Sequence, residues 1–113
     1  MELTTDDLNP DLVKVMLEGR LDTPGVDRIE TRFNAAVVAT GKHALVDLTQ
    51  VSFLSSMGIR MLISAGRAMQ QRKTRLVLFG AQPLVRDTFE AMSIDQIIDV
   101  ADSESQAMAV LAA

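Results

Sequence analysis

The sequence predicts an α/β fold in which a mixed sheet of about four to five strands is flanked by roughly four α-helices. Short segments that are apolar or alternate in polarity take turns with segments of helical period along the whole chain. The first two strand-like segments follow each other with no helical segment between them, which predicts an antiparallel pair, and helical crossovers join the remaining strands. The expected order is β-β-α-β-α-β-α-β-α.

The N-terminal third of the chain predicts a strand pair followed by a helix. Glu2–Leu8 is a polar edge strand, and after the Asn9-Pro10 turn apolar and more polar side chains alternate from Val13 to Glu18. A loop is expected over 19–25. Apolar residues at helical spacing then predict a first helix that ends at about Ala39.

The middle of the chain predicts a buried strand and a strongly amphipathic helix. Ala44–Leu48 is short, apolar and contains a β-branched residue, as is typical of a central strand. Thr49–Ser56 is expected to be the connecting loop. From Met57 to about Lys73, apolar residues recur at steps of three and four, which predicts the second helix.

The C-terminal third repeats the alternation of strand and helix. Leu76–Phe79 is the next buried strand, and Pro83 begins a helix that ends at about Met92. Ile97–Val100 is expected to be a final edge strand. A last helix over 103–111 opens with a serine and, three residues later, a glutamine, the pattern of a capping box.

Composition limits the classes of function. At 113 residues the chain predicts one domain, residues 1–113. No apolar run is long enough to cross a bilayer, so we expect a cytoplasmic protein without direct membrane insertion. The formal net charge of -4 argues against nucleic acid as a partner, and the absence of cysteine together with a single histidine argues against a metal site. No enzyme is expected, because His43 has no catalytic partner at a recognisable spacing and no glycine-rich phosphate loop is present, and no cofactor is implied.

The run from Ala44 to Ile59, ALVDLTQVSFLSSMGI, resembles the motif of STAS domains, the bacterial anti-sigma factor antagonists. In that family a central strand ends in Asp-Leu, a loop carries Val-x-Phe, and a serine precedes x-Gly and a helix. Gly19–Asp22 resembles the Gly-x-Leu-Asp that follows the second strand of the family. Two further segments, Leu78–Gly80 and Pro83–Arg86, resemble its fourth strand and the next helix, so the resemblance covers nearly the whole chain.

The resemblance implies a STAS fold and an anti-sigma factor antagonist that acts by partner switching. The unphosphorylated form would bind an anti-sigma factor with serine kinase activity and so free a sigma factor. Phosphorylation of Ser56 would block that binding, and a phosphatase would reset the protein. A monomer or weak dimer is expected.

The position of Ser56 supports this role on physical grounds. The serine directly precedes a helix, where unpaired backbone N–H groups and the helix dipole favour a phosphate. Gly58 removes a side chain beside it, which would let the backbone of a kinase approach. The alternative is that Ser55 or Ser56 is simply the N-cap of the helix, the commonest role of a serine at such a position.

Four further residues complete the expected partner-binding set of Asp22, Ser55, Ser56, Met57, Gly58, Arg60 and Met61. Met57 and Met61 form a second apolar stripe that would suit an adaptable partner surface, or else they fill the edge of the core. Arg60 lies four residues after Ser56 and could pair with its phosphate, unless it is a solvated side chain. Asp22 resembles an acidic residue near the switch serine, or it is a helix cap.

One departure from the family pattern leaves a second role open. The residue before the phosphorylated serine is most often Asp in the sporulation and stress-response members, and here it is Ser55. The alternative is a STAS accessory or regulatory subunit, for instance of a lipid-transport ATPase complex or a stress-signalling assembly, in which the same helix docks without phosphorylation.

Overall fold

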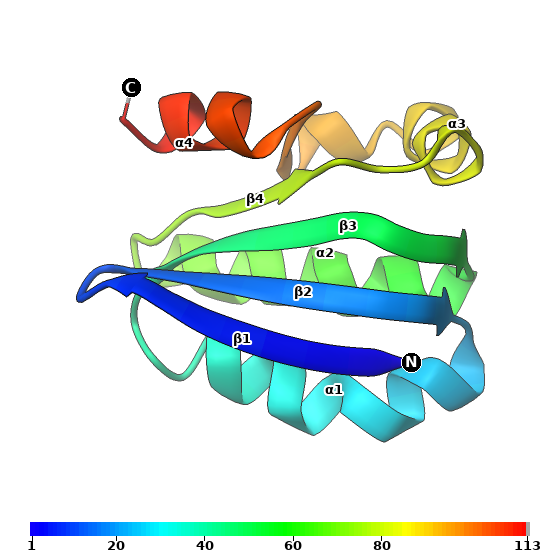
Figure 1. Cartoon of the computed structure of the whole chain (residues 1–113), viewed down its shortest axis with the longest axis horizontal. Helices are drawn as coiled ribbons and strands as arrows, with labels where there is room; N and C mark the ends of the chain where they lie inside the picture. The colour runs from blue at the N-terminus through cyan, green and yellow to red at the C-terminus, as the bar shows by residue number, and fades with distance from the viewer. Residues whose placement is uncertain (113) are drawn as a thin grey trace.

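The computed structural model describes residues 1–112, which form a five-stranded sheet whose strands lie in the order β1-β2-β3-β4-β5 (Figure 1). The first two strands are antiparallel, and the other three run parallel to the second. The strands are β1 (Glu2–Asn9), β2 (Leu12–Leu21), β3 (His43–Leu54), β4 (Leu76–Phe79) and β5 (Asp99–Ala101). The predicted α/β class and element order are confirmed.

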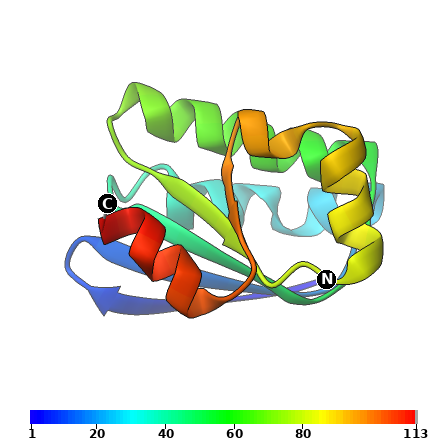
Figure 2. The same cartoon turned by 90° about the horizontal axis from the view of Figure 1, so that it is seen from above.

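Four α-helices cover the sheet unequally. They are α1 (Thr23–Val37), α2 (Ser56–Gln71), α3 (Pro83–Ala91) and α4 (Glu104–Ala112). Figure 2 shows α1, α2 and α3 on one side of the sheet and α4 on the other. Of the described elements, α4 is therefore the one helix that lies against the second face.

The larger apolar core lies between the first face of the sheet and α1, α2 and α3. Alternate residues of β2 point into it, namely Val13, Val15 and Leu17, as the period-two pattern predicts. A smaller cluster lies beneath α4, where Leu45 and Phe79 of the sheet pack against a helix that buries Ala107. No helix among residues 1–112 is long and apolar enough to cross a membrane.

Both loops predicted at the ends of β2 and β3 are wrong. β2 continues to Leu21 and β3 to Leu54, because the two strands pair in parallel along almost their whole lengths. The register between them shifts twice, at Met16/Glu18 and at Gly19/Arg20. Each shift interrupts the alternation of polar and apolar residues by which a strand is recognised in a sequence. Single residues, Asp22 and Ser55, are left to connect these strands to α1 and α2.

The last third of the chain agrees more closely with the prediction. A short 3₁₀ helix (Ile94–Gln96) precedes β5, so the edge strand begins two residues later than expected. The predicted capping box of α4 forms with one difference: the Gln106 N–H donates to Ser103 Oγ over 3.2 Å, but the Gln106 side-chain oxygen accepts from the N–H of Asp102, one residue before the cap, over 3.0 Å.

Candidate functional site

Two strand-to-helix junctions lie side by side at the carboxyl ends of β2 and β3, the edge at which parallel sheets commonly bind ligands. The junctions are built alike. In each, one polar residue caps the helix by accepting from the N–H of a glycine three residues later. The pairs are Asp22 with Gly25, at 2.9 Å, and Ser55 with Gly58, at 3.2 Å.

Ser55 fastens α2 to the neighbouring strand. Its backbone N–H and its hydroxyl each donate to the carbonyl oxygen of Leu21 over 3.0 Å, while the hydroxyl oxygen accepts from Gly58. The side chain is part-buried, and its hydroxyl is used both as donor and as acceptor. The capping interpretation therefore holds for Ser55.

Ser56 lies in a different environment from its neighbour. It is the first residue of α2 and is exposed. None of the side-chain hydrogen bonds found within residues 1–112 involves its hydroxyl, whereas Ser55 makes two. Of the two adjacent serines, Ser55 therefore holds the junction together and Ser56 faces solvent.

Gly58 does not provide the open approach that the sequence suggested. The glycine is buried, and a Cβ built on it would lie 2.6 Å from the Leu21 carbonyl oxygen and 2.9 Å from side-chain carbons of Leu21 and Leu54. The missing side chain makes room for β2 and β3 of the same molecule. As a contact for a partner, Gly58 is a wrong prediction, because its Cα faces inward.

Asp22 closes the first junction. One carboxylate oxygen accepts from Gly25, and the other lies 3.5 Å from the Arg20 side-chain Nε. The hydrogen bond from the Gly25 N–H, aided by Arg20, holds the pKa of Asp22 below its usual value, against a smaller opposing effect of burial. The interpretation of Asp22 as a helix cap is confirmed. A direct contact with a partner stays a prediction.

An Arg20–Phe53 pair at this edge is absent from the sequence-based predictions. The Arg20 guanidinium lies 4.3 Å from the centre of the Phe53 ring, since the two residues are opposite each other in the parallel register. Phe53 is half-buried, while the other three phenylalanines are buried. That neighbourhood depends on the two register shifts, which no local pattern in the sequence reveals.

Met57 and Met61 of α2 do not form the expected pair of partner contacts. Met61 is 1% exposed and belongs to the main core, so the prediction that it meets a partner is wrong and the core-filling alternative is correct. Met57 is half-buried and packs against the same core with part of its surface open. Arg60 is exposed one turn after Ser56, and none of the ion pairs among the described residues includes it.

Comparison with known proteins identifies the family. The STAS domain family matches residues 5–107, which is most of the chain. This chain belongs to the STAS domain family. The family match agrees with the motif around Ser56 and with the element order of the structure.

Relatives of this STAS chain carry consistent names. An anti-sigma-B factor antagonist of Listeria monocytogenes is 26% identical over 96 residues, which is 85% of this chain and 84% of the relative. An anti-sigma factor antagonist of Mycobacterium paratuberculosis has a similar structure, with a TM-score of 0.88, 18% identity, and coverage of 99% of this chain and 94% of that one.

The Bacillus anti-sigma factor antagonist SpoIIAA shares the STAS fold in two chemical states. Its unphosphorylated form has a TM-score of 0.72 to this chain at 18% identity, covering 95% of this chain and 94% of that one. Its phosphorylated form has a TM-score of 0.71 at 19% identity, covering 95% and 96%. This chain is thus about equally similar in fold to either state of SpoIIAA.

Proposed function

We propose that this STAS protein is an anti-sigma factor antagonist that acts by partner switching. In its unphosphorylated form it binds an anti-sigma factor that is also a serine kinase, and the sigma factor held by that protein is released. The kinase phosphorylates Ser56, the complex dissociates, and a phosphatase restores the binding form. The protein itself is a substrate of this cycle and catalyses no step.

The proposal rests on the different environments of the two serines: Ser55 is hydrogen-bonded within the junction and Ser56 is exposed. Ser55 holds α2 against β2 through two hydrogen bonds to Leu21 and caps the helix through a third from Gly58, so the exposed hydroxyl of Ser56 can be modified without breaking the junction. A phosphate there would lie at the N-terminus of α2, where free N–H groups and the helix dipole favour negative charge. The fold is therefore expected to survive phosphorylation.

The surface around Ser56 would change while the fold stays. Phosphorylation adds a charge of about -1.5 to -2 at the first residue of the helix. In a complex that buries this surface, the new charge loses its water and has no partner, which weakens binding. Arg60, one turn away, is expected to pair with the phosphate in the free protein and so to favour the dissociated state.

The presence of Ser55, where the family pattern described above most often has Asp, is compatible with this mechanism. Both residues are good N-caps, because each accepts a hydrogen bond from the N–H of the third helical residue. The substitution therefore keeps the geometry of the junction and removes a carboxylate beside Ser56. We expect the kinase to recognise the exposed serine without help from that carboxylate.

Binding from host extract tests the proposal. The wild-type protein and its Ser56→Ala, Ser56→Asp and Ser64→Asp variants are immobilised, and the retained proteins are identified by mass spectrometry. Ser64 is an exposed serine two turns further along α2, so its variant adds the same charge to the same helix away from the junction. A retained kinase is then incubated with ATP and each soluble variant, and the modified residue is located by peptide sequencing.

The proposal predicts one pattern of retention. An ATP-binding kinase is held by the wild-type, Ser56→Ala and Ser64→Asp proteins, is lost by Ser56→Asp, and phosphorylates Ser56 and not Ser55. Retention of the same transporter or scaffold proteins by all four baits would instead establish the accessory-subunit role. In that case Ser56 would not be a switch.

A further inference from the structure

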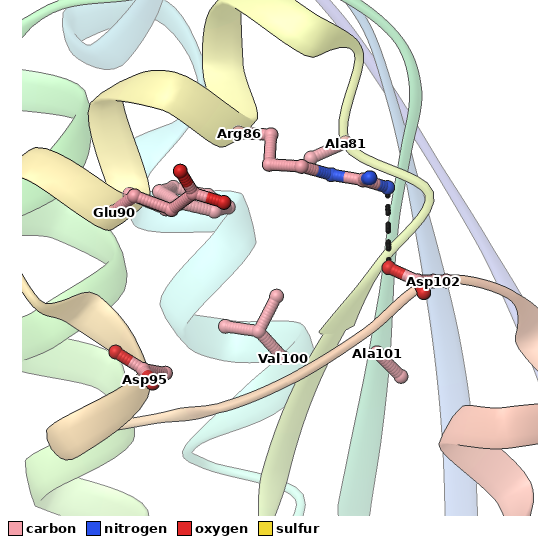
Figure 3. Close-up of a pocket in the computed structure, with 8 residues that line it drawn as sticks. Ala81, Arg86, Glu90, Asp95, Val100, Ala101 and Asp102 are labelled. Atoms are coloured by element: carbon pink, nitrogen blue, oxygen red, sulfur yellow. Dashed lines mark hydrogen bonds and ion pairs between the residues drawn. The ribbon is translucent and has the colours of Figure 1, made fainter.

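A groove separate from the Ser56 junction lies between α3 and β5 (Figure 3). Its volume is about 220 Å³. One end is formed by Ala81, which follows β4, and by Asp102, which follows β5, so the groove opens at the same edge of the sheet as Ser55 and Asp22. It is not part of the proposed switch.

The floor of the groove is apolar. Phe89 of α3 contributes a ring that is 4% exposed, and Val100 of β5 contributes a side chain that is 36% exposed although it is a large apolar residue. Ala81 adds a small side chain to this floor, whereas the Ala101 side chain packs on the opposite face of the sheet, beneath α4. An apolar chain laid along it would shield Val100 from water, which is favourable.

The rim of the groove is mainly acidic. On one side, the Arg86 guanidinium pairs with the Asp102 carboxylate over 3.1 Å, as the dashed line in Figure 3 marks. On the other side lie Glu90 and Asp95, and neither is in an ion pair found within residues 1–112. Three carboxylates thus face one guanidinium.

We propose that this groove binds an arginine side chain presented by a partner protein. The three methylene groups of arginine match the apolar floor, and the planar guanidinium, with five N–H donors, can reach more than one carboxylate of the rim. A lysine ammonium is a compact point charge, so it would contact carboxylates on opposite sides of the groove less well than a guanidinium does. The Arg86–Asp102 pair is exposed on both sides, so an incoming guanidinium can compete for Asp102 at little cost.

The inference does not depend on the sigma-factor role, and its test uses no sigma factor. The ¹⁵N-labelled full chain is titrated with the capped tripeptide acetyl-Ala-Arg-Ala-amide and, in parallel, with the same peptide containing citrulline. Citrulline is a neutral side chain of nearly the same shape as arginine. Backbone amide shifts of the protein are followed by NMR.

The arginine peptide is expected to give saturable shifts concentrated in residues 86–102, and citrulline to bind about tenfold or more weakly. The Glu90→Gln/Asp95→Asn double variant should weaken arginine binding about five- to tenfold, as expected when two partly exposed charge contacts are lost. Glu30→Gln, at an exposed carboxylate of α1, serves as the matched control and should bind like the wild type. Val100→Lys, which places a cation over the floor, should abolish the shifts.

Three outcomes would overturn the proposal. Shifts that grow without saturation, or that spread over acidic residues elsewhere, would show nonspecific attraction of a cation. Equal binding of the citrulline peptide would show that the groove accepts an apolar side chain without regard to charge. Unchanged binding by the double variant, with its amide spectrum otherwise native, would exclude Glu90 and Asp95 as the recognising groups.

Discussion

At the scale of single residues, Leu21 determines how Ser56 is presented. Its carbonyl oxygen accepts two hydrogen bonds from Ser55, and the same atom limits how closely the third residue of α2 can approach. We call Ser55, Gly58 and Leu21 together the joint between β2 and α2. Its geometry is constrained by the two hydrogen bonds to Leu21 and by the close packing of Gly58 against Leu21. Changes to any of the three are expected to move Ser56 or to destabilise the fold.

Gly58→Ala should destabilise the protein by about 1 to 3 kcal/mol, because the added methyl group is forced against Leu21 and Leu54. An alanine in place of glycine within a helix ordinarily stabilises by up to about 1 kcal/mol, so the sign of the change is diagnostic. Urea unfolding followed by circular dichroism measures it. Ser64→Ala, at an exposed position of the same helix, is the control and should change stability little. A gain in stability from Gly58→Ala would show that the joint is loose.

Ser55→Ala should cost about 1 kcal/mol through loss of the helix cap, and its lost bond to Leu21 adds to this. Ser55→Asp should recover most of the loss, since aspartate caps equally well, although it cannot donate to Leu21. The same unfolding experiment compares the two variants. If Asp recovers nothing, the donated hydrogen bond matters more than the cap.

Asp22 should make the stability of the fold depend on pH in the acidic range. Its pKa is lowered in the folded protein, chiefly by the Gly25 N–H, so its carboxylate stabilises the fold above the ordinary carboxyl pKa of 3.8. That contribution is lost as the pH falls through the lowered folded value. We expect the Asp22→Asn variant to show a flatter fall in melting temperature below about pH 4 than the wild type. Parallel curves for the two proteins would argue against the hydrogen bond.

At the scale of elements, α4 is attached more weakly than the other long helices. Ala107 is its one buried residue, and Val110 and Leu111 are partly buried. Its polar contacts include the ion pair between Glu104 and Lys14 of β2 and a hydrogen bond from Arg75 to the Val110 carbonyl oxygen. The hydrogen bond to the Glu104 carboxylate raises the pKa of Lys14, so the ammonium stays charged and the contact persists at every pH near neutrality. We expect α4 to be the first helix to open.

Lys14→Met keeps the length of the side chain and removes the ion pair, which is worth less than about 1 kcal/mol because Glu104 is partly exposed. Deuterium uptake in α4 should rise several-fold while uptake in α2 stays as in the wild type. Hydrogen exchange read by mass spectrometry distinguishes the two helices. Equal changes in both would mean that α4 opens only when the whole protein unfolds.

The elements themselves were predictable to different degrees. The bounds of α2 are predicted to within two residues, because the buried residues of a helix recur at regular spacing in the sequence. The bounds of β4 are predicted without error, because all four of its residues are buried and apolar. The last three residues of β2 and the second half of β3 are not predicted as strand, because register shifts break the alternation there. Within the site, the motif located Ser56, but the burial of Met61 and the inward position of Gly58 depend on how α2 sits on the sheet.

At the scale of the whole molecule, the negative charge of a phosphate should leave the architecture unchanged. Ser56→Asp adds a carboxylate at the start of α2, where the helix dipole makes it neutral or stabilising by up to about 1 kcal/mol. Amide spectra of this variant should change near α2 and the β2–α1 junction and remain native elsewhere. Shifts across the entire sheet would mean that the switch works by rearrangement and not by surface charge.

The two bonds that Ser55 sends to the Leu21 carbonyl join positions that are 34 residues apart in the chain. That distance must be closed, at an entropic cost, before the joint can exist. A nascent or misfolded chain in which β3 has not yet settled beside β2 offers Ser56 on an unfixed segment, without the capped helix behind it. Under the proposed function, a kinase that recognises the folded junction would therefore modify folded copies of the protein in preference to unfolded ones.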